Sequence, residues 1–403
     1  MNHHYPAIDG LRGFAAITVA VLHFVMYFPV PSDFHNTLYV VTGLGWTGVD
    51  LFFVISGFLI TQILLSTRSG HNYFKKFYIR RTLRIFPLYY TFIIVLFFIL
   101  PLFGIHSDSG RGWTWPYFFT YTQNYLNFNN IGFGPEYSGH FWSLAVEEQF
   151  YLVWPLVIYL FPPKVLAKIF PVFIIISVIA RWLLRDIIGS NGLDMLALTF
   201  TRADGLLMGG WIAFMLWRGW SVTLPRVSMQ IVISILCVGF FAAITFGLFD
   251  TSPFANHWGG VDDAIWIFVI NFIYALLLLA AIGPPNFIQK AFSNRPLRWL
   301  GKYSYAIYVF HFPVMRLLME NVDFTKLLHS LGSDDPVLGI LMFIAVAMIL
   351  TITAALISWN ILEKPFLSLK KYFPYDKPRN VMTEQPSARN GVPSIEVAPA
   401  TNL

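Results

Sequence analysis

Residues 13–30, GFAAITVAVLHFVMYFPV, form an apolar run that contains a single histidine, His23. A helix needs about 20 such residues to cross the hydrocarbon core of a bilayer. The run follows Arg12 and shows no small-residue cleavage site, so we expect an uncleaved membrane span and not a signal peptide. Because similar runs recur along most of the sequence, this pattern decides the fold class.

The composition also indicates a chain that lies largely in the membrane. Of its 403 residues, 56% are hydrophobic and 12% are charged, whereas about 25% charged residues are typical of a soluble domain. We therefore expect an all-α fold, a polytopic membrane helix bundle of about ten transmembrane helices. The expected spans are residues 12–30, 46–66, 86–103, 140–161, 168–187, 199–217, 228–249, 264–283, 303–320 and 337–362.

The chain divides into one membrane domain and a tail. Residues 1–373 contain every expected span, and we expect no separate soluble domain. Residues 374–403 are rich in Pro, Ser, Asn, Thr and Ala with scattered charges. Because such a composition cannot bury a core, we expect a disordered tail.

Lysine and arginine residues gather in every second connection between the expected spans, and residues 67–85 are an example. The positive-inside rule places these connections, and with them both termini, in the cytoplasm. Topology thus accounts for the net charge of +6, and we expect the bilayer but no nucleic acid as a partner. Since Cys237 is the only cysteine, no intrachain disulfide can form and we expect no metal site.

Ionisable side chains recur inside the expected spans, where they are costly and therefore candidates for function. Counted along ideal helices, they lie about 14 to 22 Å from the nearest expected cytoplasmic landmark. Five spans contribute to this layer, through His23, Glu147, Arg181, Asp204 and His311. Ser56 falls in the same layer, which indicates a polar site inside the bundle.

Two basic elements suit a ligand with an anionic head and a long reactive arm. Arg12 and His23 are close to three helical turns apart and share one face, with Arg12 at the cytoplasmic mouth. Arg81 and Arg84 have i,i+3 spacing, so both guanidinium groups leave the same side of a helix. Guanidinium groups bind phosphates, and acyl-coenzyme A has the required shape. We therefore expect it to be the donor.

Each of these signals has a simpler interpretation. Arg81 and Arg84 also serve as ordinary topology determinants, and an isolated membrane histidine is often structural. His311 has no helical spacing to an arginine like that between His23 and Arg12, so we expect a structural or secondary role for it. Glu147 and Glu148 point about 100° apart, so we expect at most one of them to face a given cavity.

Other polar residues leave equal alternatives open. Arg202 and Asp204 either form a buried charge pair or act directly in catalysis. Asp50 and Glu363 lie near span ends, where water or helix packing can satisfy them. The segment 113–130, rich in Trp, Tyr and Asn, suits sugar binding, but an interfacial aromatic belt is the favoured interpretation.

At these residues the chain resembles the acyltransferase 3 family of multipass membrane acyltransferases, which modify bacterial envelope glycans, Nod factors and some macrolides. The resemblance covers nearly the whole membrane region, and its short blocks occur in the family's order. They are Ile8–Gly13 leading to His23, Gly48–Leu59, the RxxR element Arg81–Arg84, Phe141–Tyr151 with its WSLxxE pattern, Arg202–Gly205, Ser304–Pro313 and Glu363–Pro365. Many larger relatives add an SGNH hydrolase-like domain, which we do not expect in this chain.

The resemblance implies an enzyme of the bacterial cytoplasmic membrane that takes an acyl group from cytoplasmic acyl-CoA, and we expect this group to be acetyl. The acceptor would be a hydroxyl of a lipid-linked or exported carbohydrate such as O-antigen or exopolysaccharide. His23 would be the general base or a transient acyl carrier, and Glu147 would orient it. Arg12, Arg81 and Arg84 would hold the coenzyme A phosphates. Supporting residues would be Asp50, Ser56, Trp142, Ser143, Arg202, Asp204 and His311.

Two rival classes remain at this point. A transporter or flippase would use the same midplane polar groups to bind and release a substrate. A structural membrane subunit would leave the phased Arg12 and His23 without a purpose. Acyl transfer by the purified protein distinguishes the enzyme from both.

Overall fold

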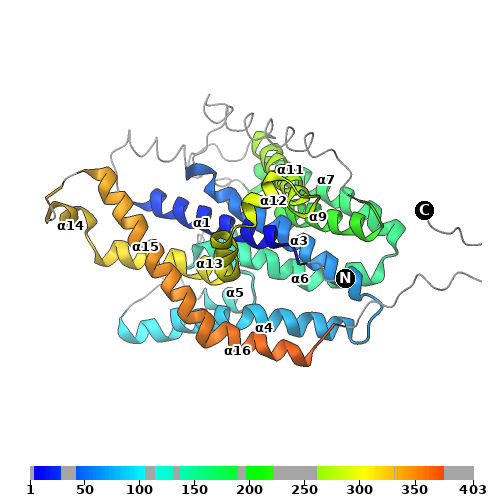
Figure 1. Ribbon diagram of the computed structural model, residues 1–403, viewed down its shortest axis with the longest axis horizontal. Coiled ribbons are helices and arrows are strands. Elements are labelled where there is room, and N and C mark those ends of the chain that lie inside the picture. The colour runs from blue at the N-terminus through cyan, green and yellow to red at the C-terminus, as the bar shows by residue number, and fades with distance from the viewer. Residues whose placement is uncertain are drawn as a thin grey trace, which may run out of the picture.

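The structure is a computed structural model that describes residues 4–28, 42–104, 114–129, 137–188, 197–221, 261–330, 332–333 and 335–375. Over these ranges the chain is helical and contains no strand, which confirms the expected all-α class (Figure 1). The expected span 228–249, Cys237 and almost all of the tail 374–403 lie outside the described residues.

The other expected spans each fall on a long helix. These helices are α1 (Pro6–Tyr27), α3 (Gly48–Thr67), α4 (Tyr73–Ile94), α6 (Trp142–Leu160), α7 (Pro163–Ile188), α9 (Thr199–Trp217), α11 (Val261–Ile282), α13 (Arg295–Asn321) and α15 (Pro336–Ser358). Short helices connect or extend them: η1 (Gly43–Thr47), α5 (Trp115–Phe119), η5 (Gly139–Phe141), α12 (Phe287–Phe292), α14 (Phe324–Ser330) and α16 (Lys364–Ser368). Within the described ranges, 6 helical segments are long and apolar enough to cross a membrane. Helices α6, α9 and α13, with 19, 19 and 27 residues, are not among these six, although an expected span falls on each of them.

Two helices begin well before the expected spans. Helix α4 starts at Tyr73 instead of near residue 86, so Arg80, Arg81 and Arg84 are helical and do not belong to a loop. Lysine and arginine are good helix formers, whereas a hydropathy window detects the apolar part alone. Helix α13 starts at Arg295, where the side chain of Asn294 accepts a hydrogen bond from the amide of Leu297 as an N-cap.

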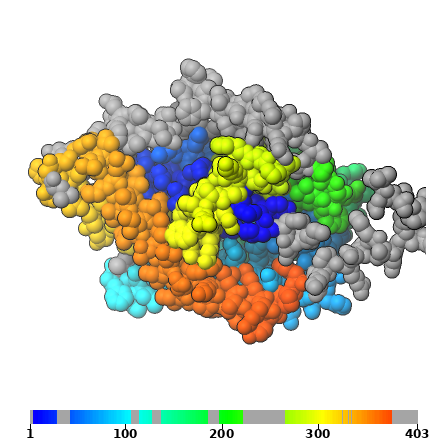
Figure 2. All heavy atoms as spheres, viewed as in Figure 1, coloured from blue at the N-terminus to red at the C-terminus, as the bar shows by residue number. Residues whose placement is uncertain are grey.

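Helix α1 lies at the centre of the bundle and packs along α13 (Figure 1). Figure 2 shows the yellow segment of α12 and α13 covering part of the blue α1. The backbones of α1 and α13 touch, because a Cβ atom on Gly13 would lie 2.2 Å from the carbonyl oxygen of Leu297, and one on Gly301 would lie 1.8 Å from that of Asp9. Small residues allow such approach between membrane helices. This contact sets the distance at which α1 and α13 present their histidines.

Helices α3 and α9 form a second close pair. A Cβ atom on Gly57 would lie 1.8 Å from the carbonyl oxygen of Leu206, and one on Gly209 would lie 1.9 Å from that of Val54. As in the first pair, the glycines let the helix backbones meet. The close packing of α3 on α9 brings Asp50 within reach of Arg202.

Candidate active site

A cavity of about 280 Å³ lies between helices α1, α3, α4, α6 and α13. Its lining includes all three arginines that the sequence assigned to phosphate binding, Arg12, Arg81 and Arg84, together with Glu147. We call the part lined by Arg12, Arg80, Arg81, Arg84 and Lys370 the basic end. The part lined by Ser56, Ser143 and Tyr308 is the hydroxyl end.

The cavity is lined by more basic than acidic side chains, and the basic ones include Arg12, Arg81 and Arg84. In the part of the chain that the structure describes, Arg12, Arg81 and Arg84 have no carboxylate within ion-pair distance. Arg84 is instead repelled by the positive charges of Arg12 and Arg81 and attracted by the negative charge of Glu363. Arg81 lies over the ring of Tyr151 at 5.2 Å from its centroid. This arrangement is complementary to an anionic ligand.

The segment after the last long helix completes the basic end, and sequence reasoning missed it. Arg80 donates from Nη1 to the carbonyl oxygens of Lys370 and Phe373, both at 3.0 Å. Its guanidinium group also lies 4.6 Å from the ring centroid of Tyr375. Burial raises the pKa of the Tyr375 phenol, so the ring stays neutral beside the arginines. These contacts with Arg80 hold the segment in place, and the segment positions Lys370 at the cavity.

The hydroxyl end holds two separate sets of short hydrogen bonds between helices. Ser56 donates to Oε1 of Glu147 at 2.7 Å. The hydroxyl oxygens of Ser143 and Tyr308 lie 2.5 Å apart, and Tyr308 lies 2.9 Å from the carbonyl oxygen of His140. Glu148 also lines the cavity, so the expectation that only one of the adjacent glutamates faces it is wrong. The cavity therefore extends over the part of the α6 surface, about 100° wide, that separates the two side chains.

The histidines form a separate cluster beside the hydroxyl end. Nε2 of His311 lies 3.2 Å from Nδ1 of His23, and the ring of His140 lies 4.8 Å from that of His311. His140 is a residue that sequence reasoning missed. The described residues contain no group of three or more His, Cys, Asp and Glu side chains arranged to hold a metal ion.

The expected pairing of His23 with Glu147 does not occur in the part of the folded bundle that the structure describes. His23 meets His311, while Glu147 bonds to Ser56, so among the described residues the structure does not join Glu147 to His23. His311, expected to be secondary, is thus the nearest polar partner of His23 from another helix. His23 is also absent from the cavity lining, whereas Tyr308 lines the cavity and packs against His311 at 5.5 Å between centroids.

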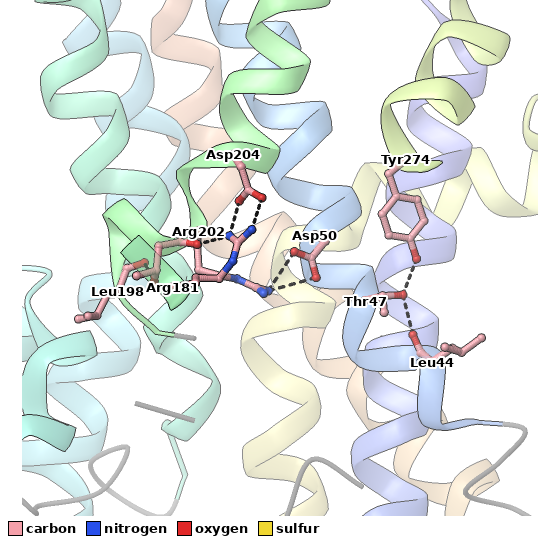
Figure 3. A network of polar contacts seen from close by, with 9 residues as sticks. Leu44, Thr47, Asp50, Arg181, Leu198, Arg202, Asp204 and Tyr274 are labelled. Atoms are coloured by element: carbon pink, nitrogen blue, oxygen red, sulfur yellow. Dashed lines mark hydrogen bonds and ion pairs between the residues drawn. The ribbon is translucent and has the colours of Figure 1, made fainter. Parts of the chain in front are cut away.

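A buried network of ion pairs joins α3, α7 and α9 (Figure 3), and none of its four charged residues lines the cavity. Arg202 contacts Asp50 at 3.0 Å and 3.1 Å, and Arg181 binds both carboxylate oxygens of Asp204 at 2.9 Å and 2.8 Å. Arg202 and Asp204 are therefore not a pair with each other. Asp50 is fully buried, so water at a span end does not satisfy it.

The neighbouring aromatic and amide side chains contact other parts of the bundle and are not free to bind a ligand. The indole of Trp142 lies 5.5 Å from the guanidinium group of Arg202. In the segment 114–129, the amide nitrogens of Gln123 and Asn124 donate to the carbonyl oxygens of Phe141 and Ala197 at 2.8 Å and 3.0 Å. These buried amides do not point outward as a sugar-binding surface would require.

Known proteins resemble this chain over most of its length. The family model described as an acyltransferase domain matches residues 5–360. The peptidoglycan O-acetyltransferase OatA of Listeria monocytogenes is 33% identical over 346 residues, which cover 80% of this chain and 51% of that protein. The O-acetyltransferase OatA of Staphylococcus aureus is 30% identical over 77% of this chain and 51% of its own length.

A third relative, the putative peptidoglycan O-acetyltransferase YrhL of Bacillus subtilis, is 28% identical over 90% of this chain and 55% of its own length. The chain thus spans about half the length of the curated relatives that it matches. No solved structure shows significant similarity to it. The match over residues 5–360, together with the helical membrane fold, shows that the chain belongs to the acyltransferase 3 family.

Proposed function

We propose that this protein is an acyl-CoA-dependent O-acetyltransferase that modifies a hydroxyl group of a cell-envelope glycan. The observation that carries the proposal is the convergence of Arg12, Arg81 and Arg84 at one end of a single cavity. The printed names of the relatives, peptidoglycan O-acetyltransferases, favour acetyl as the acyl group and a cell-wall carbohydrate as the acceptor.

The basic end suits the nucleotide half of the donor. Coenzyme A carries a diphosphate and a 3′-phosphate, and guanidinium groups bind phosphate oxygens in pairs. Lys370 adds an amino group that can donate to phosphate oxygens, and Tyr375 adds an aromatic ring beside the arginines. The positive-inside rule assigns the start of α4 to the cytoplasm, where acyl-CoA is made. We therefore place the basic end at the cytoplasmic face and both termini on that side.

The length of the cavity suits the pantetheine arm. Side chains from Val49 to Ile63 of α3 line it, and that part of a helix is about 21 Å long. A donor held by its phosphates at the basic end would carry its thioester towards the hydroxyl end. Because Tyr308 lines that end and packs against His311, the thioester would pass Tyr308 to reach His23.

His23 would act as the general base for the acceptor hydroxyl. A sugar hydroxyl attacks a thioester efficiently only when its proton is removed during the attack, and a neutral imidazole has suitable basicity near pH 7. Glu147 remains part of the site, but its contacts suggest a different role from orienting His23. It holds Ser56 and balances the charge of Arg12 inside the donor cavity.

Substitution of His23 tests the catalytic assignment. His23→Ala removes the base, and His23→Gln keeps polarity without an equivalent proton acceptor, so both should lower the rate of acetyl transfer by about 10² to 10⁴. Acetyl-CoA affinity should stay within twofold of the unsubstituted protein, since His23 does not line the cavity. The measurement is acetyl transfer to peptidoglycan fragments by purified, monodisperse protein at matched concentration.

Two results would decide against the proposal. Normal turnover of His23→Ala would remove His23 from the chemistry. Transport of a glycan without any release of free coenzyme A would favour the transporter class.

A further inference from the structure

The hydrogen bonds around His23 determine which ring nitrogen carries its proton. A carbonyl oxygen can only accept, so Nδ1 of His311, which lies 2.7 Å from the carbonyl oxygen of Tyr308, must carry hydrogen. Nδ1 of His23 lies 3.0 Å from the carbonyl oxygen of Val19 and must carry hydrogen for the same reason. In a neutral His311 the other nitrogen, Nε2, then presents a lone pair.

These assignments make the contact between the two imidazoles directional. Nε2 of His311 accepts from Nδ1 of His23 across 3.2 Å, and that hydrogen is shared with the carbonyl oxygen of Val19. The neutral His23 ring is therefore left with a lone pair on Nε2. In the described part of the chain, no residue hydrogen-bonds to this nitrogen. His311 is fully buried whereas His23 is only partly buried, so His23 alone keeps a surface open to a substrate.

We propose that His311 is a positioning residue that holds His23 in the Nδ1-protonated tautomer, so that Nε2 receives the proton of the acceptor hydroxyl. The proposal rests on the proposed function of His23 as the base. The hydroxyl oxygen bonds to the thioester carbonyl carbon while its proton moves to Nε2 of His23. The carbon–sulfur bond then breaks, and the coenzyme A thiolate takes that proton from Nε2. Acetyl ester and free thiol are the products, and no other reactant is needed.

The surroundings explain why a histidine serves here in place of a carboxylate. In the Ser-His-Asp triad a buried carboxylate holds the imidazole in the correct tautomer. Inside a membrane a buried charge is costly, whereas a neutral imidazole supplies the same acceptor without one. As positive charge develops on His23, its hydrogen bond to His311 becomes charge-assisted and therefore stronger. Phe312 packs edge-on against His23 at 5.2 Å and limits rotation of the ring.

Nitrogen NMR tests the tautomer directly and without any assay of activity. Protein labelled with ¹⁵N-histidine is reconstituted in liposomes at a pH of about 8, where neutral imidazoles prevail. The His23 signals are identified by their loss in His23→Gln. We expect Nδ1 of His23 to be the protonated nitrogen and Nε2 to be the unprotonated one. A proton on Nε2 would overturn the proposal, whatever the fate of His23 as the base.

Substitution of His311 tests the positioning role. His311→Leu removes one of the two acceptors of the Nδ1 hydrogen of His23, leaving the carbonyl oxygen of Val19, and should lower kcat by about 10- to 100-fold with little change in KM for acetyl-CoA. His311→Gln offers a carbonyl acceptor for His23 and an amide donor for Tyr308, so it should recover activity to within about tenfold of the unsubstituted protein. His329→Leu, an exposed histidine of α14, serves as the control and should leave kcat unchanged.

The two histidine substitutions separate this proposal from the function on which it rests. Unchanged kcat in a folded His311→Leu protein would overturn the positioning role while His23 could still be the base. Equal loss in His311→Leu and His311→Gln would also contradict it, because a lost packing contact would then explain both. Should His311→Leu fail to fold, His311→Gln and the NMR spectrum still decide the question.

Discussion

Two groups of arginines face the interior of this bundle, and they differ in what surrounds them. Arg181 and Arg202 each meet a carboxylate of their own, Asp204 and Asp50, at hydrogen-bond distance (Figure 3). The arginines of the basic end meet one another, backbone carbonyls, aromatic rings and a cavity. An arginine whose charge is neutralised by a buried carboxylate holds helices together. Arginines that converge around a cavity keep their charge available for an anionic ligand.

The largest effect that distinguishes the two groups concerns stability. Asp204→Ala leaves Arg181 buried without its partner, which typically costs about 3 to 5 kcal/mol. We expect a lower midpoint of thermal unfolding in detergent, followed by tryptophan fluorescence, and unchanged acetyl-CoA affinity of the protein that remains folded. The double substitution Arg181→Met with Asp204→Leu should restore much of the stability, because it removes both charges. Normal stability of Asp204→Ala combined with lost acetyl-CoA affinity would assign the network to the donor site.

A smaller effect on donor affinity tests whether the segment after the last long helix belongs to the basic end. Lys370→Ala removes an amino group from the cavity and should weaken acetyl-CoA binding about three- to tenfold, which corresponds to the net contribution of about 0.7 to 1.4 kcal/mol that one hydrogen bond typically makes. The neighbouring Lys371 does not line the cavity, so Lys371→Ala should change the affinity less than twofold. Isothermal titration calorimetry of both variants measures this. Equal effects would show that general surface charge, and not the cavity, attracts the donor.

The smallest effect concerns the carboxylate within the cavity. Glu147→Gln still accepts the hydrogen bond of Ser56 but removes a negative charge beside Arg12. Binding of the anionic donor should therefore tighten, by about threefold in a screened site. Dissociation constants for acetyl-CoA, with Glu147→Asp as the charge-preserving control, test this. Weaker binding by Glu147→Gln would show that the carboxylate acts as more than a counter-charge.

The sequence predicts the helices well because their signal is local. Apolar runs mark the spans, and the i,i+3 spacing of Arg81 and Arg84 correctly places both side chains on one side of α4, where they line the cavity. The helical spacing of Arg12 and His23, which places them on one face of α1, predicts the position of only one of them. Arg12 lines the cavity, but His23 lies beyond it in the histidine cluster.

Partners across helices could not be predicted, because they depend on how distant segments pack. The contact between His23 and His311 follows from the glycine-mediated approach of α1 and α13, which no spacing along one helix reveals. The same holds for Asp50 with Arg202 and for Arg181 with Asp204. Lys370 was overlooked because it lies after the last apolar run. Tyr308, in contrast, lies one helical turn before His311, so their proximity follows from the sequence alone.

The most direct test of the account is the affinity of acetyl-CoA for the double variant Arg81→Ala with Arg84→Ala, measured by calorimetry on purified, monodisperse protein. The matched control is Arg295→Ala with Arg298→Ala, an exposed pair with the same spacing at the start of α13 that does not line the cavity. Loss of two guanidinium contacts to phosphate should weaken binding at least about 100-fold, while the control pair stays within twofold. Unchanged affinity in the Arg81 and Arg84 variant would contradict the claim that the basic end binds the donor.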